Sequence, residues 1–131
     1  MRILHTSDLH LGKRIEGKDR LAEQKKVLEE ICGIAEEKAA DLALICGDVY
    51  DSYVPPAEAE DLFYEFVEAL SGGGRRLVVV IAGNHDDPVR LCAASCLAQK
   101  HAIIISGGGE ERFKIPDDPH IRLLEQGRNY I

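Results

Sequence analysis

The feature that most constrains the fold is a repeated pattern in which a short apolar segment runs directly into polar side chains. Residues 77–82 ("LVVVIA") are followed by Gly83 and then by "NHDD". Residues 2–7 ("RILHTS") lead into "DLH", and residues 42–46 ("LALIC") lead into "GDVYD". Short apolar runs bounded by turn residues are typical of buried strands. We therefore expect three strands that are buried along their length and polar at their ends.

Two amphipathic segments separate these strands. Residues 23–38 place apolar side chains at helical spacing, with charges on the opposite face. A second helix is expected to begin at Pro55-Pro56 and to end at the glycines 72–74. Strands that alternate with helices predict right-handed crossovers, and hence an α/β fold with a parallel sheet and helices on its faces.

The remaining third of the chain has a weaker pattern. A third helix is expected from about Pro88 to Gln99, followed by a strand at residues 102–106 and a glycine break at residues 107–109. Residues 112–131 predict two more short strands around a Pro-containing turn.

Composition limits the classes of protein to which the chain can belong. No apolar run approaches the roughly 20 residues that span a bilayer, and the N-terminus is too polar for a signal peptide. We therefore expect a cytoplasmic protein with no membrane partner. The four cysteines (Cys32, Cys46, Cys92 and Cys96) show no C-x-x-C pairing, so we interpret them as reduced and structural.

The net charge of −7 argues against a protein that holds nucleic acid by general electrostatic attraction alone. It does not exclude a phosphate ester as substrate, because carboxylates at a metal site are neutralised when divalent cations bind.

The polar clusters predict a metal site. Parallel strands bring their carboxyl ends to one edge of the sheet, so Asp8, His10, Asp48, Asn84 and His85 should lie close together. Carboxylate, imidazole and amide groups suit Mn²⁺, Mg²⁺, Fe²⁺ or Zn²⁺. A carboxylate can also bridge two ions about 3.5–4 Å apart, the arrangement used in phosphoryl displacement. Asp48, in the middle cluster, is the best candidate for a bridge.

The same residues carry a resemblance to a known family. The motifs D-x-H, G-D-x-x-D and G-N-H-D together resemble those of the calcineurin-like metallophosphoesterases, and the strings "HTSDLHLGK", "GDVYD" and "AGNHDD" look like the SbcD branch of nuclease subunits. In this chain they are Asp8 and His10; Gly47, Asp48 and Asp51; and Gly83, Asn84, His85 and Asp86. The resemblance extends from Met1 to about Gly109.

The resemblance implies a centre with two divalent metal ions, with Mn²⁺ favoured over Mg²⁺, Fe²⁺ or Zn²⁺. The first ion would take Asp8, His10 and Asp48, and the second would share Asp48 and take Asn84. His85 would face the scissile phosphate and stabilise the transition state or protonate the leaving group.

Two further expectations concern acidic residues near these motifs. Asp86 would orient His85, as a carboxylate behind an imidazole fixes its tautomer. Asp51 is interpreted as a turn or helix-capping residue just ahead of the second helix, and Asp87 as a helix N-cap before Pro88.

One departure from the family is large. The family completes its metal sites with further histidines, including a G-H-x-H motif, whereas after Asp87 the chain has only His101 and His120. We interpret both as surface or structural residues. The expectation is that residues 1–131 form the N-terminal part of the nuclease domain, within a four-layer α/β/β/α sandwich. The remaining catalytic half and a capping domain would then lie outside these residues.

The resemblance implies a metal-dependent DNA nuclease subunit of an SbcCD-like complex for repair of double-strand breaks, with DNA as substrate, an SbcC-like ATPase as partner and a homodimer as assembly. Two alternatives remain open: a small-molecule phosphoesterase on the same fold, and a scaffold subunit for an ATPase partner. The basic residues that follow the first motif are either a solvated surface or a contact for a DNA backbone. They are Lys13, Arg14, Lys18 and Arg20.

Overall fold

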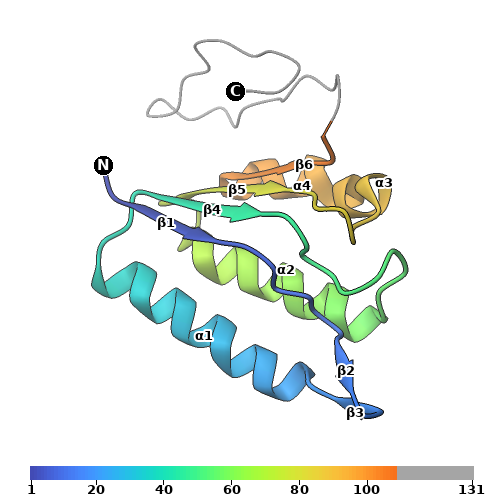
Figure 1. Ribbon diagram of the computed structural model, residues 1–131. Coiled ribbons are helices and arrows are strands. Elements are labelled where there is room, and N and C mark those ends of the chain that lie inside the picture. The colour runs from blue at the N-terminus through green and yellow to red at the C-terminus, as the bar shows by residue number, and fades with distance from the viewer. Residues whose placement is uncertain (109–131) are drawn as a thin grey trace.

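The computed structural model describes residues 1–108, and the tail predicted to hold two short strands and His120 lies outside the described residues. Its central element is a four-stranded parallel sheet in the order β1-β4-β5-β6 (Figure 1). The predicted α/β class and parallel sheet are confirmed. The strands and helices are β1 (Ile3–Thr6), β2 (Arg14–Ile15), β3 (Lys18–Asp19), α1 (Leu21–Glu37), β4 (Leu42–Cys46), α2 (Ala57–Ser71), β5 (Leu77–Ile81), α3 (Pro88–Leu91), α4 (Ser95–Ala98) and β6 (Ile103–Ser106).

Both long helices cover the same face of the sheet (Figure 1). Each crossover leads to the next strand in the same direction across the sheet, so right-handed crossovers must place α1 and α2 on one side. Alternate residues of the central strands, Ala43 and Ile45 in β4 and Val78 and Val80 in β5, are fully buried in the core. This packing holds the strand ends, and the loops that follow them, in a fixed arrangement.

Helix α2 has the ends and the buried stripe that the sequence predicts. Pro56 precedes its first residue, and Gly72 ends it in the left-handed conformation (φ 59°), which glycine adopts without steric cost. Its buried apolar residues are Ala59, Leu62, Phe63, Phe66, Val67 and Leu70. They repeat at three and four residues and so form one face.

A buried arginine joins the far ends of the two long helices. Arg76, 5% exposed, donates hydrogen bonds to the carbonyls of Ala35, Ala40 and Leu70 and to the carboxylate of Glu36. Unpaired buried acceptors cost about 1–3 kcal/mol each. Arg76 therefore fixes the edge of the sheet opposite the polar clusters.

The third predicted helix is wrong as a continuous element. Between Pro88 and His101 the chain forms α3, a 3₁₀ turn at Cys92–Ala94, α4 and a second 3₁₀ turn at Gln99–His101. Only Leu91 of its large apolar residues is buried, whereas Val89 and Leu97 are 82% and 62% exposed. Without a continuous buried stripe, tertiary packing does not support a long helix here. The expected N-cap at Asp87 is confirmed, since its side chain accepts from the N–H groups of Val89 and Arg90.

A small antiparallel hairpin of β2 and β3 was not predicted from the sequence. Its two turn residues, Glu16 and Gly17, both have positive φ (51° and 76°), as in the turns that favour two-residue hairpins. The Glu-Gly pair was the only local signal, and it is weaker than Asn-Gly or Asp-Gly. The hairpin carries Arg14 and Lys18 on exposed positions beside the first polar cluster.

Within residues 1–108, no helix has the length and apolar character needed to cross a membrane. The four cysteines, all in this region, form no disulfide, and Cys96 is exposed where Cys32, Cys46 and Cys92 are half-buried.

Candidate metal centre

The loops after β1 and β4 are joined by backbone hydrogen bonds that continue the sheet past its strands. The N–H of Asp8 donates to the carbonyl of Gly47 at 3.1 Å, and the N–H of His10 donates to the carbonyl of Asp48 at 3.0 Å. The loop after β4 is tied to β5 in the same way, because the N–H of Gly47 donates to the carbonyl of Ile81 at 2.9 Å. The three polar clusters therefore meet at one edge, as the topology predicted.

The backbone at this edge is strained in a way that aims side chains at a common point. Asp8, His10 and Asp48 all have positive φ (56°, 45° and 47°), although none is a glycine. Such conformations cost of order 1–3 kcal/mol each and collect at functional sites. The packed sheet and the hydrogen bonds between the loops hold all three residues in place.

Three side chains form the centre of this edge. One oxygen or nitrogen atom from each of Asp8, His10 and Asp48 lies within 4.8 Å of the others. Nε2 of His10 lies 4.0 Å from Oδ1 of Asp8 and 3.9 Å from Oδ2 of Asp48. The sequence predicted this group, and the structure brings it together. Two carboxylates and one imidazole nitrogen fit a divalent cation chemically.

Asn84 lies beside the same group. It lines a hollow of about 340 Å³ together with Asp8, Gly47, Asp48 and Gly83. Its side chain is exposed, so its amide oxygen is available to a bound ion. The predicted second set of ligands, Asp48 and Asn84, therefore shares one hollow with the first.

Gly83 is required where the third loop approaches Asp48. A Cβ atom on Gly83 would lie 2.1 Å from both the backbone N and Oδ1 of Asp48. Only glycine permits this approach, which places the Asp48 carboxylate against the loop that carries Asn84.

His85 stands next to His10 at the rim of the site. Their ring centroids are 5.0 Å apart with the rings nearly perpendicular. The N–H of His85 donates to Oδ1 of Asp48 at 3.0 Å, and its ring Nδ1 lies 3.2 Å from the carbonyl oxygen of Asp51. The ring is exposed, so its other nitrogen can reach a substrate.

The role predicted for Asp86 needs a correction. Its carboxylate accepts hydrogen bonds from the backbone N–H groups of Val49, Tyr50 and Gly83, and its side chain is 1% exposed. A buried carboxylate engaged with three donors holds the second and third loops together. The group at Nδ1 of His85 is instead the carbonyl of Asp51.

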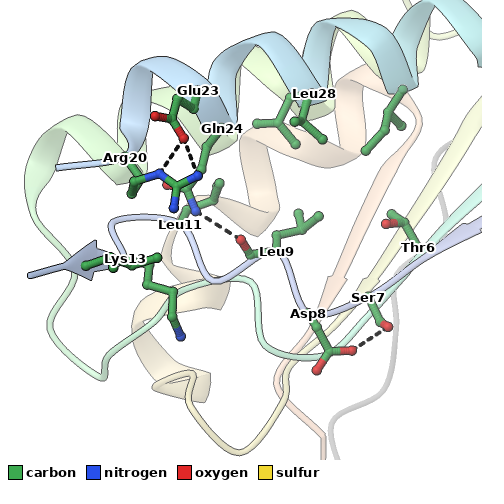
Figure 2. Close-up of a pocket in the computed structure, with 13 residues that line it drawn as sticks. Thr6, Ser7, Asp8, Leu9, Leu11, Lys13, Arg20, Glu23, Gln24 and Leu28 are labelled. Atoms are coloured by element: carbon green, nitrogen blue, oxygen red, sulfur yellow. Dashed lines mark hydrogen bonds and ion pairs between the residues drawn. The ribbon is translucent and has the colours of Figure 1, made fainter. Parts of the chain in front are cut away.

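Two other side chains of the site were not predicted from the sequence. Asp51, taken for a turn or capping residue, lies with Oδ1 3.2 Å from Nδ1 of His10. Gln24 of α1 donates to the carbonyls of Leu9 and His10 and accepts from the N–H of Gly12. Figure 2 shows Gln24 reaching from α1 to the loop that carries Asp8. The only sequence signal for Asp51 was its place in G-D-x-x-D, and for Gln24 there was none.

Tyr50 anchors the second loop from below. It is 2% exposed and packs edge-on against Phe63 of α2, with ring centroids 5.6 Å apart. Burial raises the pKa of its phenol well above the usual value, and nearby Tyr64 and Glu60 raise it further. Tyr50 therefore stays uncharged, as a packing residue, and takes no part in acid–base chemistry.

Comparison with known proteins gives a consistent result. The family model for calcineurin-like phosphoesterase matches residues 1–124. The SbcD subunit of the nuclease SbcCD from Bacillus subtilis (strain 168) is 52% identical over 107 residues, covering 82% of this chain and 27% of that protein. The proteins of the same name from Staphylococcus epidermidis and Escherichia coli K12 are 42% identical over 71 residues and 43% identical over 67 residues. These matches cover 54% and 51% of this chain, and 19% and 17% of those relatives. The chain thus spans about a quarter or less of the length of these curated relatives.

Proposed function

Because the chain belongs to the calcineurin-like phosphoesterase family, we propose that it is part of a metal-dependent DNA nuclease that hydrolyses phosphodiesters. The observation that carries the proposal is the convergence of Asp8, His10 and Asp48 within 4.8 Å, at the sheet edge that also presents His85. The name shared by the relatives, a nuclease subunit, supports DNA as the substrate.

The proposed centre takes two divalent ions, with Mn²⁺ as the first choice. Asp8, His10 and Asp48 would hold one ion, and Asp48 and Asn84 would hold the other. When bound, such ions lower the pKa of a coordinated water and offset the charge of the phosphate. The buried Nδ1 of His10, which makes no regular hydrogen bond within the described residues, supports a ring whose Nε2 is directed at an ion.

His85 is proposed to act on the phosphate, and not on the ions. Its Nδ1 is directed at the Asp51 carbonyl, which accepts a proton, so the exposed Nε2 faces outward. A nitrogen at that position can donate a hydrogen bond to a phosphate oxygen or a proton to the leaving oxygen. The Asp48 contact at its backbone N–H keeps it next to the metal ligands.

The wider assembly is proposed on the same grounds. The chain would be the N-terminal part of a longer catalytic domain, which would supply the remaining metal ligands and complete the four-layer sandwich. It would act in a cytoplasmic repair complex, as a homodimer with an SbcC-like ATPase. The printed name of the relatives, a subunit of SbcCD, supports the partner.

Cleavage assays separate the proposal from its rivals. Hairpin DNA, linear DNA and an aryl phosphodiester are each incubated with the protein, with and without Mn²⁺. We expect DNA cleavage that requires Mn²⁺, that is lost in Asp48→Asn, and that is kept in Asp41→Asn, which removes the same charge far from the site. Hydrolysis of the aryl ester without DNA cleavage would favour a small-molecule phosphoesterase. Mn²⁺ binding with no hydrolysis of either would favour a scaffold.

A further inference from the structure

Asp51 lies between the two histidines of the site and contacts both. Its Oδ1 is 3.2 Å from Nδ1 of His10, and its backbone carbonyl oxygen is 3.2 Å from Nδ1 of His85. We propose that Asp51 is a positioning residue that orients His10 toward the metal and so sets how tightly the centre holds a divalent ion. The inference rests on the proposed metal centre and assigns a task within it.

The His10 ring has one nitrogen toward the proposed ion and the other toward Asp51. Nε2 faces Asp8 and Asp48, at 4.0 and 3.9 Å, while Nδ1 faces Asp51. Nδ1 is buried, and within the described residues it has no regular hydrogen-bond partner. The carboxylate of Asp51 is therefore the anionic acceptor positioned to receive a proton from Nδ1. That leaves the Nε2 lone pair free for a metal ion.

A carboxylate behind a metal-bound imidazole has a known effect on the ion. It accepts from one ring nitrogen, fixes the tautomer and raises the basicity of the other nitrogen, and its loss costs about 10–100-fold in metal affinity. His10 is held at only one other point, its backbone, in a left-handed conformation. Its ring direction therefore depends on what its side chain contacts.

The competing interpretation is that Asp51 merely forms an ion pair with Lys13, whose Nζ lies 3.1 Å from the same Oδ1. Lys13 is 47% exposed, and His10 is 22% exposed. Exposed ion pairs contribute little. The contact with the more buried imidazole should therefore have the greater effect.

The test compares three variants by titration calorimetry with Mn²⁺. Asp51→Asn keeps the backbone carbonyl that faces His85 but removes the charged acceptor, so affinity should fall about 10–100-fold. Lys13→Gln removes the ion pair alone and Asp41→Asn removes one distant negative charge, so both should bind as the unsubstituted chain does. Equal losses in Asp51→Asn and Lys13→Gln would overturn the inference, as would unchanged binding in Asp51→Asn.

A second measurement does not depend on whether any variant folds. In the unsubstituted chain loaded with diamagnetic Zn²⁺, ¹⁵N NMR of the His10 ring should show the metal on Nε2 and a proton on Nδ1. Zn²⁺ on Nδ1 would overturn the inference. If Asp8→Asn binds Mn²⁺ as well as the unsubstituted chain, the proposed metal centre itself fails. If Asp8→Asn loses binding and Asp51→Asn does not, only the role of Asp51 fails.

Discussion

Replacing Gly83 by alanine should abolish metal binding at the Asp8/His10/Asp48 centre. The added Cβ would lie 2.1 Å from the backbone N and from Oδ1 of Asp48, so the Asp48 loop must move away. Because Asp48 is proposed to bridge both ions, Mn²⁺ affinity should fall by at least about 100-fold, the upper end of what loss of an outer partner costs. Calorimetric titration with Mn²⁺ measures the change.

Gly33→Ala is the matched control for that substitution. Gly33 lies in α1, and a Cβ there would meet nothing within 4 Å. Alanine should leave Mn²⁺ affinity unchanged and stabilise the helix by up to about 1 kcal/mol. If Gly83→Ala bound Mn²⁺ as tightly as Gly33→Ala, the Asp48 loop would not form the metal site.

His85→Ala should separate binding from hydrolysis. The substitution removes the ring proposed to face the phosphate but none of the proposed ligands, so metal content should stay the same. Hydrolysis of a phosphodiester should fall about 10²-fold or more, in line with the loss of a general acid. Elemental analysis and a rate measurement on the same sample give both quantities.

His101→Ala provides the comparison. His101 is exposed, in the turn before β6, and its loss should alter neither metal content nor rate. A loss of metal in His85→Ala would make His85 a ligand. A loss of metal in His101→Ala would show that its interpretation as a surface residue is wrong.

The sheet and the meeting of the polar clusters could be predicted because they follow from patterns spread over many residues. Three apolar segments at strand length, separated by amphipathic helices, allow few topologies. Once the strands are parallel, Asp8, Asp48 and Asn84 must share an edge, whatever the details of the loops. The residues of the candidate centre were therefore predictable as a group.

The arrangement within the site could not be predicted, because it depends on loop geometry that sequence spacing does not encode. Asp86 is adjacent to His85 in sequence, yet its carboxylate turns inward to the N–H groups of the neighbouring loops. Asp51 reaches both histidines because the loop after β4 folds back over the first loop. Gln24 contributes from a helix whose amphipathic pattern gave no reason to single it out.

The proposal that three strand-end loops form a divalent metal site can be tested without any enzymatic assay, by paramagnetic relaxation with Mn²⁺ in a ¹⁵N-labelled sample. We expect substoichiometric Mn²⁺ to broaden the amide signals of Asp8, His10, Asp48 and Asn84 first. The signal of Gly73, in the turn after α2, should stay sharp, and Asp48→Asn should remove the effect. Broadening centred on the exposed acidic residues of α2, or unchanged broadening in Asp48→Asn, would show that the ion binds elsewhere.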